Sequence, residues 1–357
     1  SMIRLRSGLE VDLRVVAPEN FGATLQYFTG NKDHNVKLRK IAIEKGFKLN
    51  EYGLFKSEKL KVESEKEVMI AGKTEEEIYD KLGLVWVPPE MREDNGEVEL
   101  AQKVFEEKAR FPDLIDYGGL RGDLQVQTNW TDGENSIEEM AREAIRIGLD
   151  YIAITDHTKT LAMTGGSDEK KLLRQMTAID EINSKLKTQK SKFRILKGAE
   201  VNILRDGSLD ISDDVLSQLD IVGAAVHSHF SLSREEQTER IKKAMSNKNV
   251  DIIFHPTGRI LNKRPAYELD MDEIMKVAKD TGTILEIDAY PDRLDLKDGY
   301  IRKAINMGLK LAINSDAHNI SHLSYLNFGV AQARRGWAEK KDIINAWPLD
   351  KMLKFLK

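Results

Sequence analysis

From about residue 119 onward, the sequence repeats one pattern: a short apolar run, a polar end, and a stretch with helical periodicity. With GDLQVQTNWTDG (Gly122–Gly133) as the first, there are seven such runs, and most are followed by a predicted helix. The others are DYIAITDH (Asp150–His157), FRILKGAEVNI (Phe193–Ile203), DIVGAAVHSH (Asp220–His229), DIIFHPTGR (Asp251–Arg259), TILEIDAYPD (Thr283–Asp292) and KLAINSDAH (Lys310–His318). This alternation predicts an α/β fold in which helices cover a parallel sheet.

Five of the seven histidines stand at the ends of these runs, and acidic residues stand at the same ends. Scattered core histidines would not fall so regularly. In barrels of parallel strands, catalytic groups gather at the carboxyl ends of the strands. We therefore predict a closed barrel rather than an open doubly wound sheet, with one cluster at its mouth. The expected members are His157, Glu200, His227, His255, Asp316 and His318.

The expected cluster offers imidazole and carboxylate groups but no sulfur, which suits zinc, manganese or iron. The first run breaks the pattern, because Gln125 and Gln127 stand where two more histidines would be wanted. Asp156 is expected either to orient the neighbouring His157 or to cap the strand. The two histidines outside the pattern are expected at the surface. These are His34 and His322.

Composition excludes several classes of protein. The 357 residues include no cysteine, which excludes disulfides, iron–sulfur clusters and thiolate zinc sites. A net charge of −4 gives no whole-chain signal for nucleic acid, so any basic surface must be local. Neither an apolar run of about 18 residues nor a signal peptide is found, so we expect a cytoplasmic protein without membrane contact.

Seven motifs in order resemble the polymerase-and-histidinol-phosphatase (PHP) domain, in the version attached to bacterial and archaeal family X DNA polymerases. They are GDLQVQTNWTDG, ITDHTKTL, KGAEVNI, VGAAVHSHF, HPTGR, LEIDAYPDRLDL and NSDAH. The resemblance implies a distorted TIM-like barrel of seven strands over residues 119–357. HPTGR and DAYPDRLDL point to the polymerase-attached version rather than to free phosphatases.

The first part of the chain resembles the palm end and nucleotide-binding subdomain of a family X polymerase. The motifs are VDLRVV, LQYFTGNKDHNVKLR, AIEKGFKLNEYGLF and TEEEIYDKLGLVWVPPEMRE. We expect a small, truncated α+β subdomain over residues 3–92, and a linker over 93–118 that follows Pro88-Pro89.

This second resemblance implies roles for individual residues. Asp12 matches the third of three palm carboxylates that hold catalytic Mg2+. The other two carboxylates precede this part of the family's sequence, so polymerisation is expected of the parent protein and not of this chain. Contacts with the incoming nucleotide and with DNA are implied for Tyr27, Phe28, Gly30, Asn35 and Arg39. Without the resemblance, Asp12 and Arg39 would be read as solvated charges and Tyr27 and Phe28 as core aromatics.

The PHP resemblance also implies two or three Mn2+ or Zn2+ ions in the cleft. Asp132, His157 and His318 would hold one ion, and Glu200, His227 and His255 a second. A third would need Gln125, Gln127 and Asp316, and two amides make poor ligands for it. His229 and Arg259 are implied as phosphate contacts, although Arg259 could equally form a structural salt bridge. The resemblance implies catalytic roles for Glu200, His227, Asp316 and His318.

Three functions stay open. The first is a metal-dependent phosphoesterase that acts as a 3′–5′ exonuclease on DNA ends, attached to a monomeric polymerase that uses DNA and dNTPs in repair synthesis. The second is a scaffold or DNA-positioning module with a degenerate metal site. The third is a phosphatase for a small phosphomonoester, as in free histidinol-phosphate enzymes.

Overall fold

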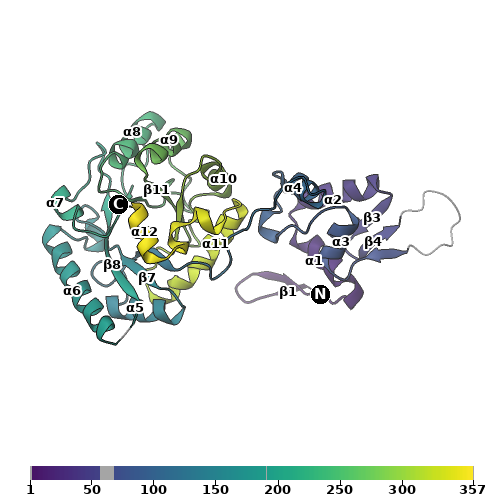
Figure 1. Ribbon diagram of the computed structural model, residues 1–357, viewed down its shortest axis with the longest axis horizontal. Helices are drawn as coiled ribbons and strands as arrows, with labels where there is room; N and C mark the ends of the chain where they lie inside the picture. Colours follow the sequence, from purple (N-terminus) through teal and green to yellow (C-terminus); the bar gives the residue numbers. More distant parts are fainter. Residues whose placement is uncertain (1, 57–67, 190, 357) are drawn as a thin grey trace. The chain divides into compact units, whose positions relative to one another are not determined.

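The computed structural model describes residues 2–56, 68–189 and 191–356, and the chain divides into two compact units, Ser1–Phe111 and Pro112–Lys357 (Figure 1). The boundary falls inside the stretch 93–118 that we expected to be a linker. Helix α4 (Glu97–Phe105) packs against α2 (Lys32–Glu44) in the first unit, and Leu114 pairs with Glu339 in the second. The expected linker is therefore shared between the two units.

The first unit combines short helices with two small antiparallel sheets. Its helical elements are η1 (Pro18–Asn20), α1 (Phe21–Thr29), α2 (Lys32–Glu44), α3 (Glu75–Lys81), η2 (Pro89–Met91) and α4. One sheet has the order β3 (Phe47–Asn50), β4 (Gly53–Lys56) and β5 (Met69–Ala71). Helix α3 begins where Thr74 Oγ1 accepts a hydrogen bond of 3.3 Å from the Glu77 backbone N–H, a typical N-cap.

The other sheet is the hairpin of β1 (Met2–Arg4) and β2 (Glu10–Asp12), on which Asp12 lies. Apolar and polar residues alternate over Leu9–Val16 as in a strand, but β2 covers only three residues of this run. In the described part of the chain, β2 pairs only with β1, and the apolar side chains Leu13 and Val15 are 58% and 90% exposed. Without a neighbouring sheet that would bury these side chains, the strand ends at Asp12.

The second unit is a seven-stranded parallel sheet in the order β12-β11-β10-β9-β8-β7-β6. Each strand pairs with its sequence neighbour, as the alternating pattern predicted. The strands are β6 (Gly122–Val126), β7 (Tyr151–Ile154), β8 (Arg194–Asn202), β9 (Ile221–Ala225), β10 (Ile252–Ile253), β11 (Ile284–Asp288) and β12 (Leu311–Asn314). The longer helices that follow them are α5 (Ile137–Arg146), α6 (Glu169–Thr188), α8 (Arg234–Met245), α9 (Met271–Thr281), α10 (Asp298–Asn306) and α11 (Leu326–Arg335).

The sheet is nearly closed into a barrel, because its two end strands meet. Val126 at the end of β6 bridges Ala317 beyond β12, and the Gln127 N–H donates to the Ala317 carbonyl over 2.8 Å. Nearer the start of β6, the Leu124 N–H donates to Asn314 Oδ1 over 3.1 Å. The predicted seven-stranded, TIM-like barrel is confirmed.

Two apolar layers hold the barrel together. One lies between the sheet and the surrounding helices, and the other fills the interior. Interior rings are accommodated beside glycines: a Cβ on Gly223 would lie 1.9 Å from the Phe254 ring. The terminal helix α12 (Leu349–Leu356) packs against this interior layer at the end where the strands begin, where Tyr151 donates to the Trp347 carbonyl over 3.1 Å. The opposite, carboxyl end is thus left for the loops.

None of the helices in the described residues has the length and apolar character that crossing a membrane would require.

Candidate metal centre

The carboxyl ends of the strands bring the predicted site residues together. Gln125 lies on β6 and Gln127 just after it, while Asp132 follows in the next loop. Glu200 lies near the end of β8, and histidines follow β7, β9, β10 and β12. These histidines are His157, His227, His255 and His318. The structure therefore places the predicted residues at the same end of the barrel.

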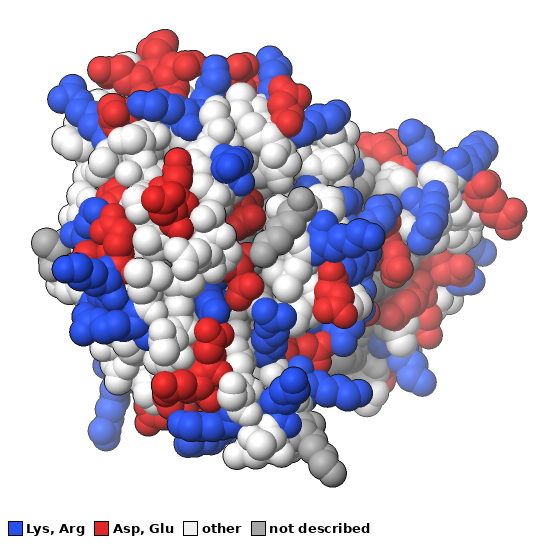
Figure 2. Space-filling view, turned by 60° about the vertical axis from the view of Figure 1, so that its left-hand side comes forward, with Lys and Arg blue, Asp and Glu red and all other residues white. Residues whose placement is uncertain are grey.

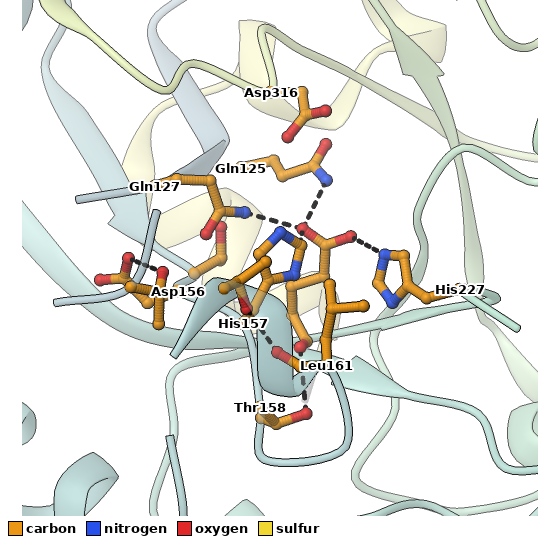
Figure 3. A network of polar contacts seen from close by, with 12 residues as sticks. Gln125, Gln127, Asp156, His157, Thr158, Leu161, His227 and Asp316 are labelled. Atoms are coloured by element: carbon orange, nitrogen blue, oxygen red, sulfur yellow. Dashed lines mark hydrogen bonds and ion pairs between the residues drawn. The ribbon is translucent and has the colours of Figure 1, made fainter. Parts of the chain in front are cut away.

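Glu200 is the buried centre of the cluster. The Nε2 atoms of His227 and His255 both lie 2.9 Å from its Oε1 atom. Its other oxygen, Oε2, accepts hydrogen bonds from Nε2 of Gln125 over 3.0 Å and Nε2 of Gln127 over 2.7 Å. Figure 3 shows the two glutamine amides on one side of this carboxylate and the His227 ring on the other. Four side chains therefore contact this one carboxyl group.

A neighbouring amide fixes the tautomer of His227. The Nδ2 group of Asn202 donates to the Thr158 carbonyl and to Asp210 Oδ2, over 3.2 and 2.9 Å. The Asn202 Oδ1 atom therefore faces His227 Nδ1, at 2.7 Å, and accepts a hydrogen bond from it, so Nδ1 carries the proton. In the neutral ring the Nε2 lone pair then faces the Glu200 carboxylate. A cation that binds both atoms removes this repulsion, so this pair fits a metal site.

His157 links this group to a second group of possible ligands, because its Nδ1 lies 3.7 Å from Oε2 of Glu200. Asp132 Oδ2 lies 3.6 Å from Nε2 of His157 and 3.6 Å from Nε2 of His318. The other ring nitrogen of His318, Nδ1, lies 2.8 Å from the Asp316 carbonyl and donates to it, so Nε2 is the atom that can bind an ion once it has lost its proton. The described residues thus offer two ligand sets that could each hold an ion. They are Asp132, His157 and His318, and His157, Glu200 and His227.

In the third expected set, Gln125, Gln127 and Asp316, the amide N–H groups already have a partner. Both glutamines turn their N–H groups towards Glu200, and within the described structure their Oε1 atoms are buried without a hydrogen-bond partner. Asp316 lies beyond Gln125, and its backbone has a φ of 50°, which is strained for a residue other than glycine (Figure 3). In this arrangement the amides act as donors to a carboxylate and not as ligands.

Charges in the cleft are arranged for cation binding. Burial opposes ionisation of Glu200, but His157, His227 and His255 outweigh it and hold its pKa well below the usual range. Burial, together with the charge of Arg293, lowers the pKa of His255 to about 3, so this ring stays neutral. Burial also disfavours charge on His318, yet Asp316 and Asp132 raise its pKa to about 10.

Two neighbouring residues have partners other than those expected. In the described structure, Asp156 forms its hydrogen bonds with residues other than His157. Its carboxylate accepts hydrogen bonds from the Thr128 backbone over 2.7 Å and from Thr131 Oγ1 over 2.7 Å, and so holds the loop that carries Asp132. Arg259 donates to the carbonyls of Arg293, over 2.9 Å, and Leu294, so it shapes a loop.

Two residues of the cleft were missed by the sequence reasoning. Asn202 stands two residues after Glu200, on the same face of β8, and this spacing could have identified it. The guanidinium of Arg293 enters the cleft from the loop after β11, with Nε 3.3 Å from Asp288 and 3.8 Å from Asp316. Only its position in DAYPDRLDL would have indicated it. His229, expected as a phosphate contact, is exposed and belongs to neither ligand set.

The predicted nucleotide contacts of the first unit lie around α1 and α2. Tyr27 and Phe28 form an edge-to-face pair with centroids 5.1 Å apart, and Phe28 is 52% exposed rather than in the core. The Asn35 amide is used internally: it accepts from Gln26 over 2.5 Å and donates to the Tyr27 carbonyl over 2.7 Å. Gly30 ends α1 with a φ of 70°, and Arg39 is half-buried.

His34 was expected at the surface but is fully buried. Its Nδ1 lies 2.7 Å from Glu97 Oε1 and its Nε2 lies 2.8 Å from the Tyr79 hydroxyl. The other histidine expected at the surface, His322, is half-buried between two tyrosine rings.

Each of the two units matches a known protein family. Residues 24–93 match the DNA polymerase beta thumb family, and residues 123–289 match the PHP domain family. The chain is 42% identical over 347 residues to the DNA polymerase/3′-5′ exonuclease PolX of Bacillus subtilis (strain 168). The chain belongs to the family X DNA polymerases that carry a PHP domain. The match covers 97% of this chain and 58% of the length of that relative.

Two further proteins are similar to part of this family X chain. A probable phosphatase of Thermoanaerobacter sp. (strain X514) is 34% identical over 194 residues, which cover 52% of this chain and 73% of that protein. The histidinol phosphate phosphatase of Lactococcus lactis, solved with zinc, L-histidinol and phosphate, is 15% identical, with a TM-score of 0.43. That match covers 60% of this chain and 93% of the phosphatase.

Proposed function

We propose that the second unit is a metal-dependent phosphodiesterase that shortens DNA from the 3′ end. The observation that carries this proposal is the buried Glu200 carboxylate, which faces the free nitrogen of His227 over 2.9 Å. Two buried groups that present lone pairs to each other repel, and a cation bound between them removes this repulsion. Such a cation at the open end of a barrel, beside further histidines, is the setting of hydrolytic metal sites.

The cleft holds two ions in this proposal, Mn2+ or Zn2+. One is bound by Asp132, His157 and His318, and the other by Glu200 and His227 with His255. When bound, such ions polarise phosphoryl oxygens and lower the pKa of water. A third ion is not included, because the N–H groups of Gln125 and Gln127 already donate hydrogen bonds to the Glu200 oxygen that it would need.

The protein's own groups orient this chemistry. Asn202 keeps the proton of His227 on Nδ1, and the Asp316 carbonyl keeps that of His318 on Nδ1. Arg293, which is mostly buried beside Asp288 and Asp316, offsets the negative charge of these two carboxylates near the place where a phosphate would enter.

DNA is the proposed substrate because of the first unit and the relatives. The thumb match and the Bacillus relative's printed name, which includes a 3′-5′ exonuclease, support an end-processing role beside a polymerase. In that longer setting Asp12 would contribute to an Mg2+ site, and Tyr27, Phe28, Gly30, Asn35 and Arg39 would contact dNTP or DNA. The proposal includes a monomer in the cytoplasm.

The charges on the visible surface fit a DNA contact limited to a small area rather than one spread over the surface. On the face in view, Figure 2 shows basic and acidic side chains interspersed, with no continuous basic field. This face therefore offers no extended basic track for a phosphate backbone.

A scaffold without catalysis is the second candidate, and the two glutamines in ligand positions favour it. The test is incubation of the chain in Mn2+ with 5′-labelled DNA, single-stranded and 3′-recessed, in parallel with histidinol phosphate. Shortening from the 3′ end that Glu200→Ala abolishes, and that the surface control Glu235→Gln retains, supports the exonuclease. Release of phosphate from histidinol phosphate without shortening supports a phosphomonoesterase, and neither product supports the scaffold.

A further inference from the structure

Four aromatic side chains form a cluster beside the metal centre, which we call the aromatic rim: Tyr290, His322, Tyr325 and Phe328. The rings of His322 and Tyr325 are stacked with centroids 4.8 Å apart, and Tyr290 meets each of them edge-on at 5.3 Å. Phe328 continues the cluster at 6.0 Å from Tyr325 and is 49% exposed. The other three rings are half-buried, so the rim faces solvent along one side.

The rim is attached directly to residues of the cleft. Tyr290 follows β11, and its backbone N–H donates to Asp288 Oδ1 over 2.7 Å. His322 and Tyr325 lie on η4 (Ile320–Tyr325), which follows β12, and the His318 backbone N–H donates to His322 Nδ1 over 3.3 Å. Because both segments leave the carboxyl ends of strands, the rim and the proposed ligands share the barrel mouth.

Packing alone does not account for this position. Aromatic rings that serve only the core are buried, whereas this cluster keeps ring surface exposed at the mouth of a charged cleft. Exposed rings beside a site that cleaves phosphodiester bonds can hold unpaired bases by stacking, since every base has a π face. A base inside a duplex is already stacked on its neighbours and cannot use such a surface.

We propose that the aromatic rim stacks on an unpaired nucleobase at the 3′ end of single-stranded DNA and so positions the terminal phosphodiester at the metal centre. This inference rests on the proposed exonuclease function and names the side chains that would hold the terminal base. Single strands and frayed ends are the preferred substrates, without selection for one base.

The test pairs protein variants with substrate variants. Wild type, Tyr325→Leu and Tyr290→Leu are assayed in Mn2+ on single-stranded oligonucleotides that end in normal nucleotides or in abasic residues. Leucine keeps apolar packing and removes the ring. Phe355→Leu, an exposed aromatic on α12, is the matched control.

Stacking predicts that wild type and Phe355→Leu prefer the normal end, with a KM lower by roughly 5- to 150-fold, the range typical of one stacked base. In Tyr325→Leu and Tyr290→Leu this preference shrinks towards one. A purely structural role slows both substrates equally and leaves the preference intact, which would overturn the inference. If wild type shortens neither substrate, the proposed function itself has failed.

Binding supplies an independent readout in the presence of EDTA. Fluorescence anisotropy with the same oligonucleotides should show weaker binding of normal ends by the two rim variants and unchanged binding by Phe355→Leu. Equal affinity of wild type and both rim variants would also contradict the inference.

Discussion

Gln127 donates a hydrogen bond of 2.7 Å to Oε2 of Glu200, the carboxylate at the centre of the cleft. With Gln125, which donates to the same oxygen over 3.0 Å, it supplies the partial positive charge that a further cation would otherwise supply. The two glutamines therefore satisfy Glu200 without a third ion, and they explain how an incomplete ligand set remains compatible with a buried carboxylate.

Restoring imidazoles at these positions tests that explanation. The double variant Gln125→His, Gln127→His replaces donors with ligands and should increase the number of bound ions per chain and the nuclease rate. The metal content is measured by mass spectrometry of the protein after equilibration with Mn2+. Gln218→His, on the surface, is the control, and no change in either quantity would rule out the explanation.

Asn202 is predicted to act through His227. In Asn202→Ala the ring loses the acceptor that holds its Nδ1 proton, so either nitrogen can carry it. Loss of such a partner typically weakens metal binding about 10- to 100-fold. Calorimetric titration with Mn2+ measures the effect, with the exposed Asn327→Ala as the control. An affinity equal to that of wild type would show that Asn202 has only a packing role.

Metal binding should depend on pH through His318. Because the pKa of this ring is raised to about 10 in the metal-free protein, it carries a proton at neutral pH that must leave before Nε2 can bind an ion. Affinity should rise with pH, by up to about tenfold per unit below pH 10. His255, with a pKa of about 3, is already neutral and adds no dependence above pH 5. Titrations in buffers of different ionisation enthalpy should detect about one released proton, and none would contradict the assignment.

The buried pair of His34 and Glu97 should make the first unit sensitive to acid. Burial opposes ionisation of Glu97, but hydrogen bonds from His34, from its own backbone and from Asn95 outweigh it and lower its pKa below 4.5. A depressed carboxyl pKa stabilises the folded unit above pH 4.5, and this contribution is lost as pH falls through the folded-state value.

Glu97→Gln should accordingly lower the stability of the first unit at pH 7 by about 2 kcal/mol and weaken its loss in acid. Hydrogen exchange of peptides from residues 68–111 follows this unit separately. Glu99→Gln, which removes an exposed ion pair with Lys37, should change stability by less than about 1 kcal/mol. Equal effects of both substitutions would show that burial of Glu97 does not matter.

The sequence was sufficient for the barrel and for the position of the site, because apolar runs with polar ends reveal both the strands and their carboxyl ends. It could not reveal the pairing of distant side chains. His34 stands in a polar segment, and its partners Tyr79 and Glu97 are 45 and 63 residues away. The direction of the glutamine amides likewise depends on which atom of Glu200 they meet.

The central claim is that the cleft binds two ions around Glu200 and His157. Anomalous diffraction at the manganese edge, from crystals equilibrated with Mn2+, tests it most directly. We expect two peaks, one among Asp132, His157 and His318 and one beside Glu200 and His227. A third peak within bonding distance of Gln125 and Gln127, or no peak beside Glu200, would contradict it.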